Sequence, residues 1–277
     1  MSSSPPPKSR PASQPASPTA PGAGAPAKNP NGAAAGLLAN PASRGPTVKD
    51  LLKMQWDYAV YTPEAQRSDG TSVKPQREAL QLQDAFRTIA GTDPRPLLVL
   101  RECSVCNKTD NALLRPGIDN ERTIVLSRWF HCVKLPVDVI QPDQPFNALF
   151  PTNDAEHLFV CSVDGSGRIP LESDTSRPEL WSAMSKVLAA SYAKDPAAVA
   201  KEILHAHDKL DTLDARVRDL EKSRDDLVES AGRMDKDKVK KLEKEIEATK
   251  KELADEKKSI DRLSKVDLKP AKKAERS

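Results

Sequence analysis

The large apolar residues of this chain are concentrated in one segment, and this distribution limits how the chain can fold. Most of them lie between Leu97 and Leu188, so this stretch can bury a hydrophobic core while the flanks cannot do so alone. The mean hydropathy of -0.59 and the aromatic content of 4% are too low for two ordinary cores in 277 residues. The distribution therefore predicts one folded domain between polar flanks.

The two ends of the chain are predicted to be tails. Residues 1–47 consist mainly of Pro, Ala, Ser and Gly with hardly a hydrophobic anchor, and such a segment cannot bury enough apolar surface to offset its ordering entropy. We interpret it as a disordered, solvated tether. The basic end, residues 269–277, is interpreted as a frayed tail.

Charge and cysteine content exclude several classes of protein. The 43 basic and 40 acidic residues nearly cancel to a net charge of +3, whereas a nucleic-acid-binding protein should carry a dominant basic stripe. The sequence has no run of 18 apolar residues for a transmembrane helix, and its N-terminus lacks the apolar stretch of a secretory signal. Four cysteines are too few for a disulfide scaffold. We therefore expect a cytoplasmic protein without nucleic-acid or membrane partners.

Helices and strands alternate along the predicted domain. Residues 48–75 predict a short helix, over 48–58, and a linker. Residues 76–89 predict a helix that ends at Gly91. The order of elements predicts an α/β domain over residues 76–193, with one small mixed sheet and helices on both faces. The predicted strands cover 96–101, 129–139, 157–163 and 168–172, with a hairpin at Asp164-Gly-Ser-Gly and a last helix over 179–192.

Two cysteines, Cys103 and Cys106, come directly after the first of these strands. Residues 104–114 have helical character, so the order is strand, CxxC and helix. A helix N-terminus presents free N–H groups and a partial positive charge, which stabilise a thiolate. The second cysteine lies within the first turn and can resolve a mixed disulfide. We therefore predict that Cys103 is an attacking thiolate and Cys106 its resolving thiol.

Over about residues 76–193 the chain resembles the thioredoxin-like fold superfamily. The resemblance rests on the CxxC between strand and helix and on the segment His157-Leu-Phe-Val-Cys-Ser-Val-Asp-Gly-Ser-Gly. It implies that the strand before Cys103 is central and that the strands carrying Cys132 and Cys161 flank it. Cys132 and Cys161 would then be two strand spacings apart, roughly 9–10 Å. This distance exceeds the limit of roughly 7 Å between the Cα atoms of a disulfide. Cys132 and Cys161 are therefore expected to be buried free thiols.

Two positions depart from the pattern of the family. Ala155-Glu156-His157 stands where the family usually has a cis-proline before the strand that faces the CxxC, and Glu102 replaces the tryptophan that often precedes the first cysteine. The charge of Glu102 opposes thiolate formation. These departures favour a non-catalytic domain, whereas the CxxC between strand and helix favours thiol chemistry.

Three interpretations of the CxxC follow: a redox pair, a relic pair without chemistry, and a metal site. In a metal site, His157 would approach from the facing loop, and Cys132 or His131 would be a remote fourth ligand. Structural zinc usually needs four convergent ligands, often from two paired knuckles. Because the chain has one CxxC, we predict no metal ligand and no cofactor.

Residues 195–268 carry an apolar heptad pattern, which is typical of a coiled coil. A step of five from Met234 to Val239 breaks the phase near residues 231–237. The two arms are similar in length, each about 30 residues or roughly 45 Å, as an antiparallel helical hairpin requires; one long helix that pairs with a second chain is the rival interpretation. Arg224 interrupts the first seam. The seam positions are Val199, Ile203, Ala206, Leu210, Leu213, Val217, Leu220, Leu227, Ala231 and Met234, then Val239, Leu242, Ile246, Thr249, Leu253, Glu256, Ile260 and Leu263.

The sequence thus supports two hypotheses of function. The first is a thiol–disulfide oxidoreductase that uses Cys103 and Cys106 on a protein or small-thiol partner. The second is a non-catalytic interaction module in which the coiled coil binds a protein partner or self-associates, and the CxxC is incidental. Enzyme activity is therefore an open question at the level of sequence.

Overall fold

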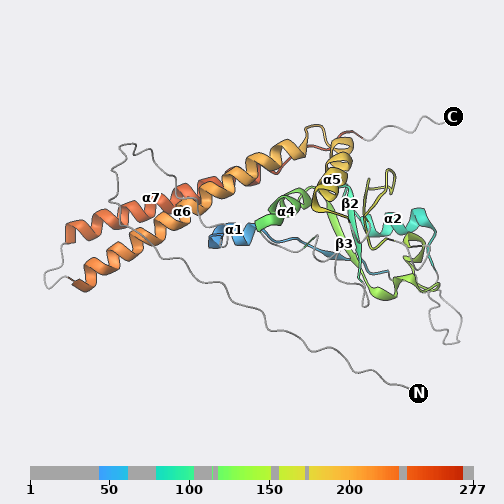
Figure 1. Cartoon of the computed structure of the whole chain (residues 1–277), viewed down its shortest axis with the longest axis horizontal. Coiled ribbons are helices and arrows are strands. Elements are labelled where there is room, and N and C mark those ends of the chain that lie inside the picture. Colours follow the sequence, from blue (N-terminus) through green and yellow to red (C-terminus); the bar gives the residue numbers. More distant parts are fainter. Residues whose placement is uncertain are drawn as a thin grey trace, which may run out of the picture. The chain divides into compact units, whose positions relative to one another are not determined.

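The folded part of the chain contains one five-stranded mixed sheet, which lies toward one end, with two long helices extending away from it (Figure 1). The computed structural model describes residues 44–61, 79–102, 114, 118–150, 156–171, 175–230 and 236–270. The strands lie in the order β1-β3-β2-β4-β5; β3 is parallel to β1 and β2, and β4 is antiparallel to β2 and β5. Their bounds are β1 (Asp57–Tyr58), β2 (Leu97–Arg101), β3 (His131–Leu135), β4 (Leu158–Cys161) and β5 (Ile169–Leu171).

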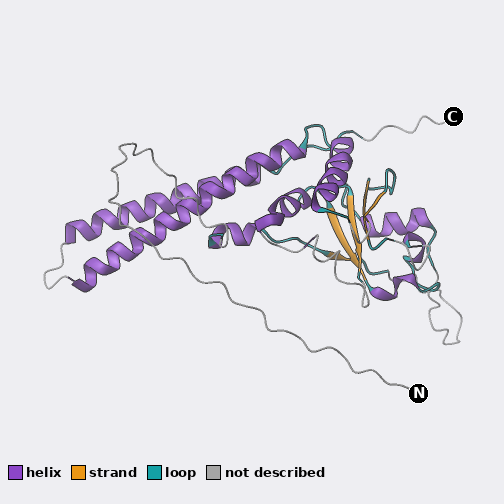
Figure 2. Ribbon diagram, in the orientation of Figure 1, coloured by secondary structure: helices purple, strands orange, loops and turns teal. Residues whose placement is uncertain are grey.

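Helices cover both faces of this sheet (Figure 2). On one face lie α4, α5 and the first part of α6, and on the other lie α2 and the short 3-10 segments η2 and η3. The prediction of a small mixed sheet in an α/β fold is therefore confirmed. The bounds are α1 (Pro46–Leu51), α2 (Leu82–Ala90), η1 (Ile118–Asn120), α4 (Glu121–Ser127), η2 (Val137–Ile140), η3 (Asn147–Leu149), α5 (Arg177–Ser191), α6 (Pro196–Ser230) and α7 (Lys236–Leu263).

The central strand β2 feeds both hydrophobic cores, because successive side chains of a strand point to opposite faces. Leu98 and Leu100 join the cluster beneath α4, α5 and α6, whereas Leu97 and Val99 join the cluster beneath α2. All five residues of β2 are buried. A strand that is buried on both faces has a continuous run of apolar residues. This run made β2 predictable from the sequence.

Local signals in the sequence set several element ends. Helix α2 ends at Gly91, whose φ of 56° is a left-handed conformation that glycine adopts at low cost. Helix α5 begins with a capping box between Ser176 and Glu179. In the β4–β5 hairpin, Gly165 has φ of 83°, and a Cβ there would lie 2.4 Å from the ring of Phe86. Gly165 is thus required both by the turn and by its contact with α2.

Three predicted elements differ from the structure. The helix expected over 76–89 begins only at Leu82. The helix expected over 48–58 ends at Leu51, and Asp57–Tyr58 instead forms the edge strand β1 beside β3. The sheet therefore extends beyond the predicted domain range 76–193. The sequence did not predict this strand, because two residues are too few to show a strand period. The strand expected over 129–139 covers only residues 131–135, since Pro136 has no N–H to donate to a neighbouring strand.

The two long helices lie side by side (Figure 1) and run in opposite directions. Lys209 in α6 pairs with Glu256 in α7 at 2.5 Å, and Glu221 further along α6 pairs with Lys250 earlier in α7 at 2.7 Å. The seam positions predicted in the described helices are all buried or partly buried. The connection over residues 231–235 lies outside the described residues.

The first half of α6 carries a second buried stripe besides the seam. Ala200, His207 and Asp214 are seven residues apart and all buried, and this part of α6 contacts α1, α4 and α5. The Asp214 carboxylate accepts hydrogen bonds from the backbone N–H and the hydroxyl of Thr47, both at 3.0 Å. The next position of this stripe, Glu221, is only partly buried. The packing of α6 against the rest of the domain therefore ends between these two positions.

Arg44 fastens the segment before α1 to two helices. Its Nε and Nη2 donate to the carboxylate of Glu121 in α4 at 2.5 and 2.6 Å. Its Nη1 donates to Asp208 and Asp211 in α6, both at 2.7 Å. The predicted tail 1–47 is therefore too long, because a buried carboxylate and two further carboxylates hold Arg44; residues 1–43 lie outside the described residues.

The segment after α7 is also bound. Leu268 forms a bridge with Tyr192, and the backbone N–H of Lys269 donates to the Ser191 carbonyl at 2.8 Å. Lys269 thus belongs to the folded part rather than to the predicted tail 269–277, of which residues 271–277 lie outside the described residues. Within the described ranges, each helix is too short or too polar to cross a membrane.

Candidate functional site

The predicted catalytic cysteines follow the central strand of the sheet. Cys103 and Cys106 themselves lie outside the described residues, but the strand end that precedes them is described. The Arg101 N–H donates to the carbonyl of His157 at 2.7 Å, and the Glu102 N–H donates to the carbonyl of Leu135 at 2.8 Å. The chain is therefore held from both sides up to the residue before Cys103.

Two cations accompany Glu102 at this strand end. Its carboxylate lies 3.5 Å from Nζ of Lys134 on β3. Arg101 is only 4% exposed, and its guanidinium lies 5.4 Å from the centre of the Phe150 ring. Positive charge favours a thiolate and a carboxylate opposes it. Lys134 and Arg101 thus carry charge of the favourable sign at the strand end that precedes Cys103 in the sequence.

In the sequence, the CxxC lies between two parallel strands, β2 and β3. Strands β2 and β3 are parallel neighbours in register from Leu97↔His131 to Arg101↔Leu135, and α4 lies in the connection between them. Leu114, in the same connection, is buried beneath α4 and α5.

The other two cysteines are buried free thiols, as predicted. Cys132 pairs with Leu98 and Cys161 with Leu97, so they lie on opposite sides of β2. They also belong to opposite cores: Cys132 lies beneath α4 and α5, and Cys161 beneath α2. Burial raises the pKa of each thiol to about 12, so neither is a thiolate at neutral pH.

The structure places His131 and Cys132 toward the opposite end of the sheet from His157, which disfavours a metal site that combines them. His131 pairs with the first residue of β2. The backbone carbonyl of His157 accepts a hydrogen bond from the N–H of Arg101, the last residue of β2. Four residues of strand separate these positions by roughly 13 Å. His131 instead contacts the Asp57 carboxylate through Nε2 at 3.1 Å. Across the described part of the chain, no group of three or more His, Cys, Asp or Glu residues is arranged to hold a metal ion.

The sequence did not identify Arg101 and Lys134 as parts of this site. A signal was nevertheless present, since each is a charged residue within or at the end of an apolar strand segment.

Comparisons with protein-family models, with curated proteins and with solved structures found no match to this chain. The functional argument therefore depends on the geometry and chemistry of the residues themselves.

Proposed function

We propose that the protein is a thioredoxin-like thiol–disulfide oxidoreductase in which Cys103 attacks and Cys106 resolves. The observation that carries the proposal is the position of the CxxC, directly after the central strand β2 of a sheet with the order β1-β3-β2-β4-β5. The strands bearing Cys132 and Cys161 flank β2, as the resemblance to the thioredoxin-like superfamily implies.

The proposed chemistry begins with the Cys103 thiolate, which attacks one sulfur of a substrate disulfide. The substrate S–S bond breaks, a mixed disulfide with Cys103 forms, and the departing thiolate takes up a proton. The Cys106 thiolate then attacks the Cys103 sulfur and releases the second substrate thiol. The substrate is reduced, and the protein gains a Cys103–Cys106 disulfide. The reverse sequence oxidises a dithiol, and the relative reduction potentials decide the direction.

Charge at the end of β2 supports the first step. Lys134 lies beside Glu102, and Arg101 is a buried cation one residue earlier. Buried Cys132 and Cys161, whose pKa values are raised to about 12, cannot compete as nucleophiles at neutral pH. Attack is therefore assigned to the CxxC.

Trapping of a mixed disulfide tests the proposal. Oxidised glutathione is added to the reduced full-length chain, and bound glutathione is measured by intact mass. Cys106→Ser should retain one glutathione on Cys103, because the resolving thiol is absent, and Cys103→Ser should retain none. Cys132→Ser is the matched control, which should behave like the parent chain. Equal and slow labelling of all variants would contradict the proposal.

A second function is favoured by one observation on the helix pair. We propose that α6 and α7 form an antiparallel coiled coil whose far part is a surface for a protein partner or for self-association. In α6, the described residues after Val217 are all at least partly exposed, and Val228 is 48% exposed. If the trapping experiment fails, this interaction module is the function that the chain supports.

A further inference from the structure

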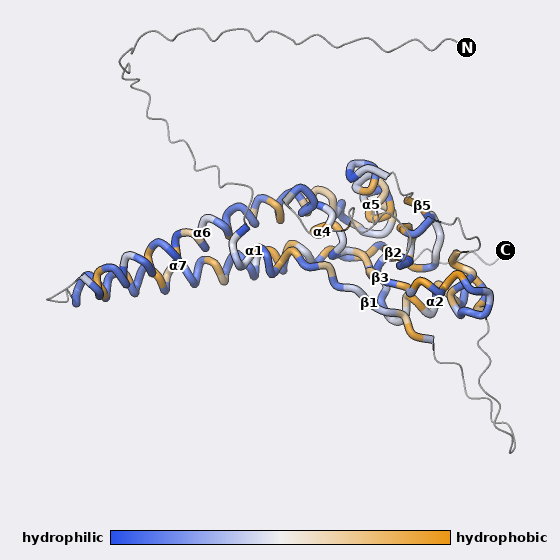
Figure 3. Tube along the Cα trace, turned by 60° about the horizontal axis from the view of Figure 1, so that its bottom comes forward, coloured by the Kyte–Doolittle hydropathy of each residue, from blue (hydrophilic) through white to orange (hydrophobic). Residues whose placement is uncertain are grey.

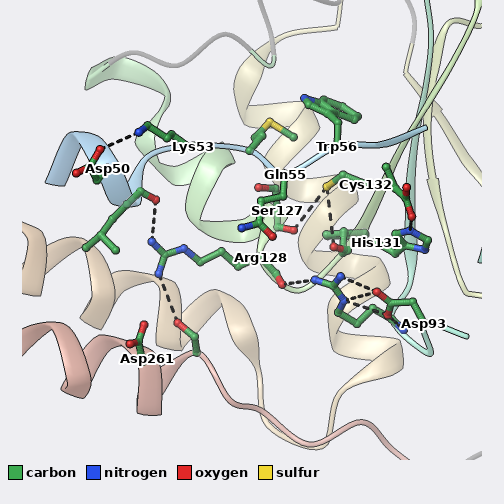
Figure 4. A pocket seen from close by; sticks show the side chains of 16 residues that line it. Asp50, Lys53, Gln55, Trp56, Asp93, Ser127, Arg128, His131, Cys132 and Asp261 are labelled. Carbon is green, nitrogen blue, oxygen red and sulfur yellow. Dashed lines mark hydrogen bonds and ion pairs between the residues drawn. The ribbon is translucent and has the colours of Figure 1, made fainter. Parts of the chain in front are cut away.

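A cavity of about 810 Å³ lies at the end of the sheet opposite to the strand end that leads into Cys103 (Figure 4). Its wall comes from residues 50–57 between α1 and β1, the end of α4, the start of β3, and Asp261 and Ser264 at the end of α7. Its size is that of a small-molecule site. Its described wall includes the start of β3, whereas Cys103 follows the last residues of β2, so a ligand of this cavity is proposed separately from the thiol chemistry.

Arg128 extends across this cavity with part of its hydrogen-bonding capacity unused (Figure 4). A guanidinium has five N–H donors. In Arg128, one donates to the carbonyl of Leu51 at 2.9 Å, and another lies 3.5 Å from the hydroxyl of Ser264. Among the described residues, no carboxylate lies within ion-pair distance of this guanidinium. Burial lowers the pKa of Arg128, and the charge of Asp261 opposes this shift only in part.

The other cations of the cavity are already paired. Lys53 contacts Asp50 at 2.7 Å at the exposed rim. Arg95 contacts Asp93 at 2.6 Å and also donates to the Arg128 carbonyl at 3.0 Å. The N–H donors available to an anion that enters the cavity are therefore those of Arg128.

The rest of the wall restricts the kind of anion. Leu51, Met54 and Trp56 are partly buried apolar side chains at the cavity that pack on the core, so an apolar body can lie against them. The cavity has three lysine or arginine residues against four aspartates, which disfavours a dianion. The four aspartates are Asp50, Asp57, Asp93 and Asp261.

We propose that this cavity binds a small monocarboxylate with an aromatic or branched aliphatic body, whose carboxylate accepts hydrogen bonds from the Arg128 guanidinium. The planar guanidinium fork matches a carboxylate in two-point contact. Trp56 and its apolar neighbours contact the body of the ligand. A phosphate ester of the same body would bring a second negative charge against the surplus of aspartates.

The first test compares three probes by calorimetric titration of the full-length chain. The probes are phenylpropionate, phenyl phosphate and benzyl alcohol, which share an aromatic ring and differ in charge. Phenylpropionate should bind, with phenyl phosphate and benzyl alcohol each at least about tenfold weaker. Tighter binding of phenyl phosphate, equal binding of benzyl alcohol, or no binding of phenylpropionate would overturn the proposal. None of these outcomes bears on the thiol chemistry of the CxxC.

Two variants with the same loss of charge locate the site. Arg128→Gln should weaken phenylpropionate binding about tenfold or more, whereas Lys53→Gln should leave it unchanged because Lys53 is paired at the rim. An equal effect of both variants would indicate diffuse charge attraction and overturn the assignment. If Arg128→Gln does not fold, Arg128→Lys replaces it, since it keeps the charge and removes the fork. An unchanged affinity in Arg128→Lys would likewise contradict the two-point contact.

Discussion

The two halves of α6 carry the same heptad pattern but pack against different surroundings. Before residue 218, the second stripe of Ala200, His207 and Asp214 is buried against α1, α4, α5 and α7, and so are all seam positions except the partly buried Val199. After Val217, none of the described α6 residues is buried. Hydrophilic residues prevail along the parts of α6 and α7 next to the 231–235 connection (Figure 3).

This difference shows what a heptad pattern can and cannot predict. The seam describes how α6 meets α7, and it continues along both halves. The second stripe describes how α6 meets the sheet domain, and it consists of a small residue and two polar ones, which no hydrophobic pattern reveals. The near half of α6, residues 196–217, is therefore an additional layer of the domain core. The far half, residues 218–230, is an arm that pairs with α7.

Matched leucine truncations give the largest expected difference between the halves. Leu210→Ala should lower the free energy of unfolding by about 3 kcal/mol, because Leu210 is 0% exposed and a cavity remains. Leu227→Ala, in the partly buried far half, should cost about 1 kcal/mol or less. Urea unfolding followed by circular dichroism measures both. Equal losses would mean that the far half is as well packed as the near half.

Removal of Arg44, which contacts the near half of α6, should lower the free energy of unfolding by a similar or slightly smaller amount than Leu210→Ala. Arg44→Ala leaves the buried Glu121 carboxylate, which is 4% exposed, without its cation, and breaking such a pair costs about 3 kcal/mol. Lys53→Ala breaks a pair whose partners are both 70% exposed and should leave the free energy of unfolding nearly unchanged, because solvent screens such a pair. The same unfolding assay compares the two.

A double-mutant cycle sharpens this prediction. If Glu121 is destabilising once unpaired, then Glu121→Gln in the Arg44→Ala background should recover part of the lost free energy of unfolding. Additive effects of the two substitutions would show that Arg44 does not stabilise the fold through Glu121.

The near half should also be sensitive to acid through His207. Burial, followed by the charges of Arg128 and Arg44, lowers the pKa of His207 from 6.5 to about 4, and neither ring nitrogen has a hydrogen-bond partner among the described residues. The unfolded chain therefore binds a proton at higher pH than the folded chain. The stability contributed by neutral His207 is complete above about pH 6.5 and is lost as pH falls toward 4, by about 2 kcal/mol at pH 5.

The variant His207→Leu should remove this acid dependence between pH 7 and pH 5. It should also unfold at a higher temperature at neutral pH, because an apolar side chain replaces a buried polar one without partners. His205→Leu, at an exposed position of the same helix, is the control and should keep the parental pH profile. An unchanged profile in His207→Leu would place the acid sensitivity elsewhere.

Removal of the N-terminal segment should have the smallest effect. Deletion of residues 1–43, which are rich in Pro, Ala and Ser, should shift the melting temperature by less than about 2 °C, because this composition supplies few anchors for packing. Deletion of residues 1–47 removes Arg44 and Thr47 and should lower the melting temperature markedly. Equal effects of the two deletions would show that Arg44 and Thr47 do not fasten this segment.

Elements with a strong local signal were predictable from the sequence. The buried run of β2, the end of α2 at Gly91 and the hairpin glycines follow from periodicity and backbone conformation. The edge strand β1 was missed, because two residues have no readable period and their pairing partner, β3, lies more than 70 residues away. The docking of Arg44 was missed because the three carboxylates that hold it lie on two distant helices.

The candidate site was predictable only in part. The position of Cys103 after a buried strand followed from local pattern, and so did the burial of Cys132 and Cys161. The proximity of Lys134 to Glu102 depends on the pairing of β2 with β3. The cavity around Arg128 could not be anticipated, because its wall gathers residues from the segment after α1, from α4 and β3, and from the end of α7.

The most direct measurement of the proposed function is the alkylation rate of each cysteine in the reduced, full-length chain at pH 7. Limiting iodoacetamide is added, and peptide mass spectrometry follows the modification of Cys103, Cys106, Cys132 and Cys161 with time. Cys103 should react fastest, at least about tenfold faster than Cys132 and Cys161, because only a thiolate attacks and burial holds those two thiols protonated. Slow and equal reaction of all four cysteines would contradict a catalytic CxxC.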